Sequence, residues 1–341
     1  MGKVGRNFKL HPTFAGIMEP SPKTIYRDIC QAASQLPLFH QPWWLDAACG
    51  PGSWQVAVAR NEETGAVEGV LPYCVRSRFG VRILSPPPLT PFLGPLLFPP
   101  EGLNPYKQRT FEEAAVHRLL AQLPRTPVAR LKLHYDVHNW LPYRQAGFQQ
   151  TTRYSYRILE PGDPDRVWNN FHPKLRNKIS HAARLCIVQP ADDAGPVFRL
   201  FEQGFRRKGR AAPVSAEWFA GLDEALQQHG ARAAFLCSGG QGQPLAGAYI
   251  AWDEQSAYLL LTGVDGQANI RGAAALAVWA SIQFVAERGL IYDFEGSMLP
   301  GVERFFREFG GELCAYHYLV RYRSWLWRVV DGWNAGYVTG K

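Results

Sequence analysis

The sequence contains no long hydrophobic run. Its longest apolar stretch, from Ala273 to Ala286, is interrupted by Ser281 and Gln283 and is shorter than the roughly 20 residues that a membrane-spanning helix needs. We therefore predict that this stretch is a buried helix of a folded domain. The first nine residues are basic, but no apolar segment follows them, so a secretory signal is not expected.

Cysteine pairs with metal-binding or redox spacing are also missing. The six cysteines are scattered along the chain and none forms a C-x-x-C pair, which argues against a zinc site and against a disulfide framework. We expect no metal centre, and a reduced, cytoplasmic protein.

The chain is poor in charge and rich in apolar residues, at 19% and 46%, which excludes wholesale disorder. A length of 341 residues suggests two domains or one large one, at roughly 100 to 200 residues per domain. Lys and Arg number 37 against 29 Asp and Glu, a net charge of +8. This excess favours anionic partners such as phosphates, nucleic acid or acidic lipids.

One unit of structure is predicted to occur twice. In both halves a Tyr-Asp strand precedes a Leu-Pro pair, a short helix, a glycine and an aromatic strand, at 131–156 and again at 290–318. A hairpin with a Gly-containing turn comes earlier in each half, at 57–73 and 233–251. The shared order is β-β-β-α-β-α-β, with a further helical region leading each half.

These repeats predict an α/β protein with mixed (α+β) sheets. The turn cluster from Glu160 to Pro164 is the best linker candidate. We expect an N-terminal domain at 1–160, a C-terminal domain at 165–322 and a Trp-rich amphipathic helix or tail at 323–341.

The repeated order resembles the GNAT acyltransferase fold. The chain is similar to tandem GNAT proteins of the Fem-like group, which transfer an acyl or aminoacyl group to an amine. The similarity spans residues 40–320 and is sharpest at Tyr292–Ser297 with Pro300–Phe306; Trp43–Asp46 and Pro87–Thr90 also resemble bacterial members. The resemblance implies two tandem GNAT-like domains, each a mixed sheet flanked by helices.

An acyl-donor site is predicted at the start of the helix that follows residue 272. The stretch 269–274 matches the GNAT motif Q/R-x-x-G-x-G/A except at its first residue, and the N–H groups of a helix N-terminus bind phosphates. The expected contacts to acyl-CoA, a co-substrate, are Asn269, Arg271, Gly272, Ala273 and Ala274. The corresponding stretch 104–110 has no glycine pair. We therefore expect the donor in the C-terminal domain, and an acceptor-shaping or structural N-terminal domain.

Acyl transfer to an amine needs a base, and two carboxylates are candidates. Asp293 and Glu295 are two apart on one strand, so their side chains share a face. The alternative is that Asp293 caps a loop or pairs with Arg304 or Arg307. Asp136 occupies the equivalent place in the first half, which makes Glu295 the better candidate base.

The resemblance also implies an oxyanion-binding backbone N–H, within 257–263. The tyrosine acid of many GNAT enzymes is absent from the helix 300–309. Tyr292 or Tyr316 would replace it, or the step proceeds without one.

Substrate contacts are predicted from polar residues near these sites. A basic helix at 172–184 supplies Arg176 and Lys178. One interpretation is that these residues bind a phosphate of the donor or the acceptor, and the other is that they lie on a solvated face of the helix. Ser297 and Arg304 complete the predicted substrate site. A second basic run at 206–210 is open to the same two interpretations.

The C-terminus combines an apolar stripe of Leu326, Val329, Val330 and Trp333 with neighbouring arginines. Such a helix lies on an anionic membrane or docks on its own domain.

Three functions remain at this stage. The first is an N-acyltransferase that moves an acyl group from a CoA thioester to an amine of a small or cell-envelope-related acceptor. The second is Fem-like transfer from aminoacyl-tRNA to a peptidoglycan-type precursor, although no charged coiled-coil insertion is evident. The third is a non-catalytic RNA- or membrane-binding module on a degenerate acyltransferase fold. The oligomeric state stays open.

Overall fold

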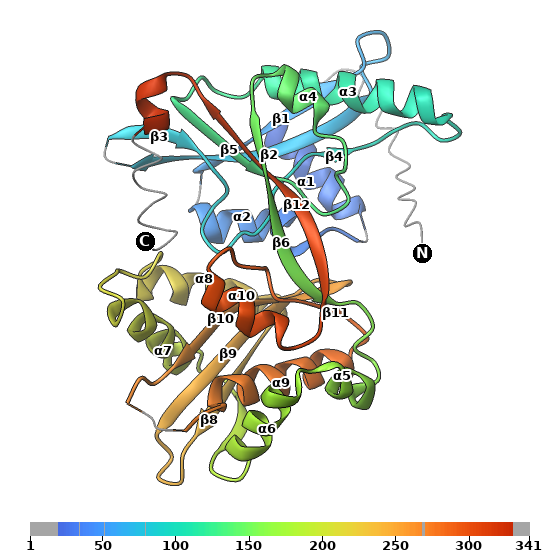
Figure 1. Ribbon diagram of the computed structural model, residues 1–341. Coiled ribbons are helices and arrows are strands. Elements are labelled where there is room, and N and C mark those ends of the chain that lie inside the picture. The colour runs from blue at the N-terminus through green and yellow to red at the C-terminus, as the bar shows by residue number, and fades with distance from the viewer. Residues whose placement is uncertain (1–19, 34, 51, 79, 268–269, 330–341) are drawn as a thin grey trace. The chain divides into compact units, whose positions relative to one another are not determined.

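The chain folds into two compact units, each a mixed sheet with helices (Figure 1). The computed structural model describes residues 20–33, 35–50, 52–78, 80–267 and 270–329. The first unit comprises the described residues up to Thr152 and from Tyr316 onward, and the second comprises Arg153–Ala315. The predicted α/β class, with mixed β-sheet flanked by helices in each unit, is confirmed.

In the first unit the strands pair in the order β1-β2-β3-β5-β12, and β4 pairs with β2 beside this path. The β3–β5 pair is parallel and the other pairs are antiparallel. Its elements are α1 (Pro22–Ala32), the 3-10 helix η1 (Leu38–His40), α2 (Pro42–Cys49), β1 (Trp54–Arg60), β2 (Val67–Arg78), β3 (Val81–Leu84), β4 (Leu96–Leu97), α3 (Pro105–Ala121), β5 (Val128–Lys132), α4 (Leu141–Gln145) and part of β12 (Glu312–Tyr322).

The second unit repeats this arrangement in the order β7-β8-β9-β10-β11-β6. Its one parallel pair is β10–β11. Its elements are part of β6 (Gln149–Ile158), α5 (Pro164–Asn170), α6 (Pro173–Ala182), β7 (Ile187–Ala191), α7 (Gly195–Arg206), α8 (Ala216–Gln228), β8 (Arg232–Ser238), β9 (Pro244–Trp252), β10 (Ser256–Val264), α9 (Ala273–Ala286), β11 (Ile291–Asp293) and α10 (Pro300–Arg307).

Each sheet takes its last strand from the other half of the sequence. β6 follows β5 along the chain but pairs with β11, at Asp293↔Arg157. β12 follows β11 but pairs with β5, at Tyr322↔Val128. The expected ranges 1–160 and 165–322 assigned each aromatic strand to its own half, whereas the compact units change over inside β6 and β12.

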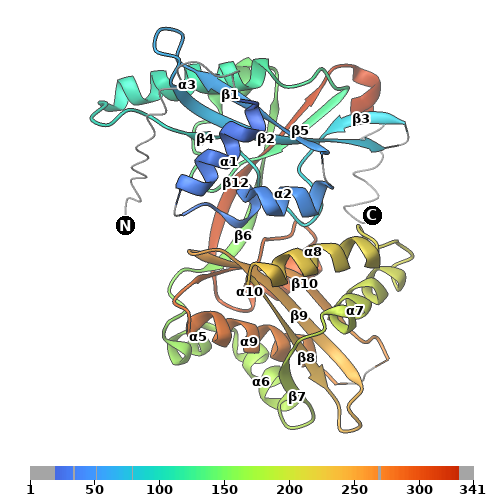
Figure 2. The ribbon, with the colours of Figure 1, turned by 180° about the vertical axis from the view of Figure 1, so that it is seen from behind.

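The core of the second unit lies on both faces of its sheet. α6, α9 and α10 cover one face and α7 and α8 the other, as the two opposite views show (Figures 1 and 2). As predicted, α9 is a buried helix, with nine of its 14 residues buried, four of them alanines. Small side chains let a helix approach a sheet closely and still exclude water. Among the described helices, none is long and apolar enough to cross a membrane.

A pair of glycines lets α7 rest directly on the sheet. Gly247 of β9 and Gly263 of β10 are register partners. A Cβ atom on Gly247 would lie 2.8 Å from Val197 Cγ2, and one on Gly263 would clash with the backbone of Leu200 and Phe201. The sheet therefore has a flat place at which the α7 backbone packs.

We expect Gly263→Ala to destabilise the protein by about 1–3 kcal/mol, because the added methyl group must displace a helix backbone. Gly221→Ala is the matched control, since Gly221 is an exposed residue of α8 with no atom within 4 Å of the added Cβ. It should stabilise by about 0.5–1 kcal/mol. Urea unfolding of both variants tests this, and equal stabilities would contradict the close packing of α7.

Candidate active site

The two parallel strands of the second sheet part after three residues. β10 pairs with β11 from Ser256↔Ile291 to Tyr258↔Asp293. β11 ends there, whereas β10 runs on to Val264. The edge of β10 beyond Tyr258 therefore extends past its neighbour, and a strand edge of this kind offers backbone N–H and C=O groups to an extended ligand.

A β-bulge lies at the start of this edge. The register with β9 shifts between Leu259, opposite Ile250, and Leu261, opposite Tyr249, which makes Leu260 the extra residue. A bulge interrupts the ladder and leaves its extra residue unpaired. It falls inside the stretch 257–263 in which the oxyanion donor was predicted.

Asp293 ends β11 as a fully buried carboxylate. Its Oδ1 accepts hydrogen bonds from Ser155 Oγ at 2.6 Å and from the Glu295 backbone N–H at 2.7 Å, and its Oδ2 lies 3.4 Å from Arg157 Nε. Arg157, rather than Arg304 or Arg307, is thus its ion-pair partner. Because a buried charge is tolerated only when it is paired and hydrogen-bonded, this network fixes the end of the strand.

Sequence reasoning missed Ser155 and Arg157. Both lie on β6, which by sequence belongs to the first repeat. No local signal ties them to Asp293, because the pairing of β6 with β11 joins residues about 135 positions apart.

Glu295 has a left-handed backbone, with φ +57. A residue with a Cβ pays about 1–2 kcal/mol for this conformation. The hydrogen bond from its N–H to Asp293 holds the turn, and the next residue, Gly296 with φ +71, packs against the Tyr154 backbone where no Cβ fits. Backbone strain of this kind concentrates at functional sites. The strained backbone therefore makes Glu295 a candidate functional residue.

Tyr292 lies apart from this turn, because neighbouring residues of a strand face opposite sides of the sheet. It is fully buried, and its hydroxyl oxygen lies 2.7 Å from Ser281 Oγ. Burial raises the pKa of Tyr292 well above its usual value. The hydrogen bond with Ser281 lowers this pKa by a smaller amount. Tyr316, the other candidate acid, belongs to the first unit, where it packs against Tyr135.

The start of α9 has no side-chain cap. Gly272 is the N-cap residue with φ +98, Arg271 is exposed and Ala273 is buried. In contrast, the start of α3 is capped by Asn104, whose Oδ1 accepts the Lys107 N–H at 2.9 Å, and has a proline at its first position. The start of α9 therefore has no side-chain cap of the kind that α3 has. Asn269 lies outside the described residues.

Gly272 also has a packing role. A Cβ at this residue would clash with the Lys178 carbonyl of α6, so the close approach here is made by a neighbouring helix. The Lys178 side chain reaches Glu308, with Nζ 3.1 Å from Oε2. Arg176 donates to Asn169 Oδ1 at 3.3 Å. The structure thus brings α6 against the predicted donor site.

The other predicted substrate residues lie on the segment that follows Glu295. Ser297 Oγ accepts the Leu299 N–H at 3.1 Å, and Arg304 is exposed on α10. Glu295 and Ser297 therefore lie on the loop between β11 and α10, and Asp293 is the strand residue that precedes this loop.

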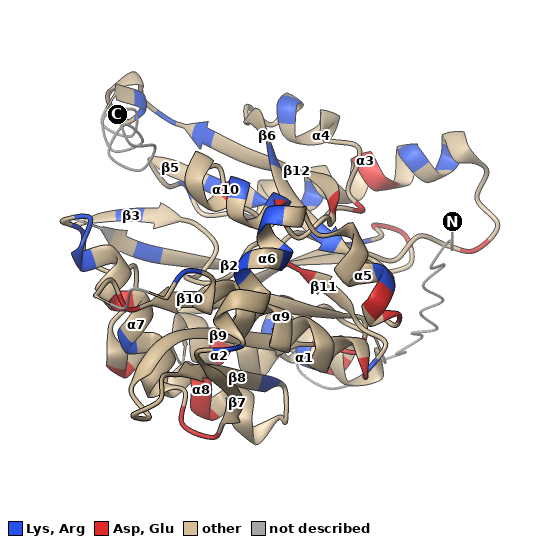
Figure 3. Cartoon of the chain, turned by 60° about the horizontal axis from the view of Figure 1, so that its bottom comes forward, with Lys and Arg blue, Asp and Glu red and all other residues tan. Residues whose placement is uncertain are grey.

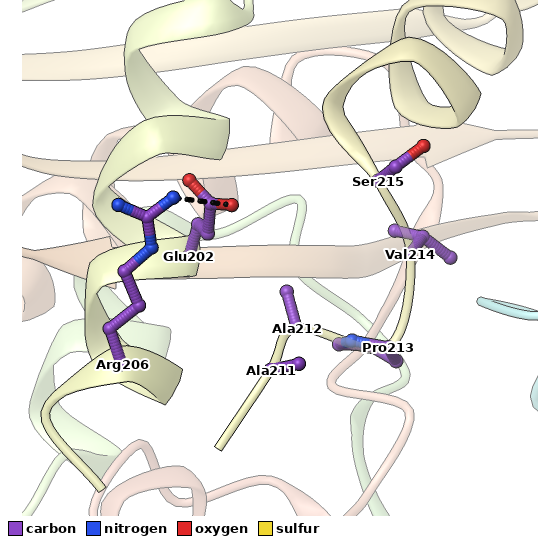
Figure 4. A pocket seen from close by; sticks show the side chains of 7 residues that line it. All are labelled: Glu202, Arg206, Ala211, Ala212, Pro213, Val214 and Ser215. Atoms are coloured by element: carbon purple, nitrogen blue, oxygen red, sulfur yellow. Dashed lines mark ion pairs between the residues drawn. The ribbon is translucent and has the colours of Figure 1, made fainter. Parts of the chain in front are cut away.

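A hollow of about 520 Å³ lies beside α7 (Figure 4). Glu202 and Arg206, an ion pair at 3.1 Å, form one wall, and the residues 211–215 before α8 form the other. None of the predicted site residues lines it. Among the described residues, no group of His, Cys, Asp or Glu is arranged to hold a metal ion.

Comparison with known proteins agrees with this architecture. Residues 170–307, within the second unit, match the acetyltransferase (GNAT) domain family. No curated protein matches the sequence.

Solved structures resemble both units together. The crystal structure of FemX is 14% identical, with a TM-score of 0.59 over 88% of this chain and 96% of that one. A conserved protein of unknown function from Bacteroides thetaiotaomicron is 11% identical, with a TM-score of 0.51 over 88% and 97%. A tandem GNAT protein from the clavulanic acid biosynthesis pathway is 11% identical, with a TM-score of 0.46 over 83% and 88%. The resemblance to Fem-like tandem GNAT proteins is confirmed for the fold.

The strain at Glu295 predicts that its glycine and alanine variants have the reverse of the usual order of stability. Glu295→Gly should be more stable than Glu295→Ala by about 1 kcal/mol, because only alanine pays for the left-handed backbone. At Glu224 of α8, the order should be the ordinary one, with alanine more stable by about 1 kcal/mol. Urea unfolding of the four variants measures both differences. The same order at both sites would exclude a strained turn.

Proposed function

We propose that the chain is an N-acyltransferase that moves an acyl group from a CoA thioester to the amine of a small or cell-envelope-related acceptor, in the second unit. The observation that carries this proposal is the parting of β10 from β11 after Tyr258 and Asp293, with a bulge at Leu260 and Glu295 beyond the strand end. The GNAT domain match over 170–307 supports it.

The residues at this site suit a CoA thioester. The edge of β10 from Leu259 to Val264 offers backbone groups to the amides of the pantetheine arm. The uncapped start of α9 offers N–H groups to the pyrophosphate, and the exposed Arg271 adds a positive charge. When bound, the thioester supplies an activated acyl carbonyl.

The chain's own residues supply the base and the oxyanion donor. Glu295 accepts the proton of the attacking amine, and Asp293 acts as a positioning residue that holds the Glu295 backbone. The backbone N–H at the Leu260 bulge stabilises negative charge on the carbonyl oxygen. Tyr292, buried and bonded to Ser281, packs the core, so the leaving thiolate is protonated without a tyrosine from this strand.

We place the acceptor near α6 and the loop before α10. Arg176, Lys178, Ser297 and Arg304 are the proposed contacts. In the first unit the corresponding helix start is capped by Asn104, so we assign that unit an acceptor-shaping or structural role.

We further propose a cytoplasmic location, in keeping with six free cysteines. A small-molecule or cell-envelope precursor acceptor fits this location. Transfer from aminoacyl-tRNA is the alternative, and the donor experiment below separates the two.

An acyl-CoA should raise the thermal unfolding midpoint. A ligand at 100 times its dissociation constant stabilises by about 2.7 kcal/mol, or several degrees at roughly 2–4 °C per kcal/mol. We expect such a shift with at least one of a panel of acyl-CoAs, and none with pantetheine, which lacks the phosphate groups of CoA. No shift with any acyl-CoA, together with activity on aminoacyl-tRNA, would favour the alternative donor.

Replacing the proposed base should affect turnover and not donor binding. Glu295→Gln should lower kcat by about 10² to 10⁴-fold while the acyl-CoA thermal shift is retained. Glu303→Gln is the matched control, because the Glu303 carboxylate of α10 accepts a hydrogen bond from the Tyr156 hydroxyl of β6 and is outside the proposed chemistry. Full activity of Glu295→Gln would remove Glu295 from the mechanism.

A further inference from the structure

The positive charge of the protein belongs to its first unit. Segments 1–152 and 316–341 contain 20 Lys and Arg against 11 Asp and Glu, whereas 153–315 contain 17 against 18. The unit without the proposed donor site is thus the cationic one. Net charge of this kind directs a surface toward anionic partners.

Much of this charge gathers at one end of the first sheet. The segments 75–85, 124–135 and 316–329 contain nine Lys and Arg and no Asp or Glu. They are neighbours in the sheet, since Arg76 pairs with Ile83, Ile83 with Val128 and Val128 with Tyr322. We call this region the basic end (Figure 3). Its exposed arginines are Arg76, Arg82, Arg125, Arg323 and Arg328.

The basic end also presents apolar side chains to solvent. The helical segment 325–329 follows β12, and Trp325, Leu326 and Val329 on it are 73%, 56% and 50% exposed. Trp327 points the other way and packs against the cluster of Ile83, Val128 and Val320. The segment is therefore fixed to the sheet by one tryptophan while its outer face stays apolar.

We propose that the basic end binds an anionic lipid surface. Arginines attract acidic headgroups, and Trp with aliphatic side chains enters the boundary between headgroups and acyl chains. Binding of nucleic acid would explain the arginines, and bases could stack on Trp325, but it gives no role to the exposed Leu326 and Val329. Binding to a lipid surface gives a role to the arginines, the tryptophan and both aliphatic side chains.

Co-sedimentation of the full chain with phosphatidylglycerol–phosphatidylcholine vesicles tests this surface, with phosphatidylcholine vesicles for comparison. We expect binding to the anionic vesicles alone, weakening as salt rises. One arginine near such a surface is worth about 1 kcal/mol, or about fivefold in affinity. The double variant Arg323→Gln/Arg328→Gln should then bind about 25-fold more weakly.

The apolar contribution needs its own variant. Trp325→Ser/Leu326→Ser should weaken vesicle binding by more than tenfold with an unchanged salt dependence. Lys208→Gln/Arg210→Gln removes two exposed charges from the second unit and should bind like the wild type. Far-UV circular dichroism and the thermal midpoint show that each variant is folded.

Three results would overturn the proposal. One is absence of wild-type binding to anionic vesicles at low salt. Another is unchanged vesicle binding by the Trp325/Leu326 variant. The third is binding of bulk tRNA that depends on Arg323 and Arg328 while vesicles are not bound, which would assign the basic end to nucleic acid. None of these measurements depends on acyl transfer.

Discussion

The buried carboxylate of Asp293 is the interaction on which the candidate site depends. A charge without solvent must be satisfied by protein groups, and Asp293 is satisfied by Ser155, Arg157 and the Glu295 N–H. Two of these groups come from β6, the strand contributed by the first repeat. The turn that carries Glu295 therefore depends on β6, whose residues from Arg153 onward belong to the second unit.

The two repeats share a topology and differ in what their helix starts and strand ends offer. In the second unit, β10 extends beyond the end of β11, and α9 begins at a glycine with no side-chain cap. In the first, Asn104 satisfies the start of α3, and the opposite end of the chain adds basic and apolar side chains to the sheet. Duplication of one fold thus leaves room for one half to hold a donor and the other to contact a partner.

Much of the candidate site was predictable from sequence, and the rest depends on long-range pairing. The glutamate and aspartate were evident because a Tyr-Asp strand recurs, and the helix start at 272 was evident from its small residues. Predicting Asp293 and Glu295 as a pair of similar carboxylates did not show their different settings, because burial of Asp293 and the left-handed backbone of Glu295 arise from packing against β6. Gly272 looked like a ligand-facing residue, yet its missing Cβ makes room for the Lys178 carbonyl of α6.

The sequence by itself determined the elements: two repeats of hairpin, strand, helix, strand, helix and strand, and a central helix that is apolar on nearly all sides. Such features follow from local periodicity, in which each residue's neighbours along the chain decide the outcome. Only the tertiary structure decided which aromatic strand completes which sheet. The strands at 149–158 and 312–322 pair with β11 and β5, and this choice is made by backbone pairing between residues far apart in the chain.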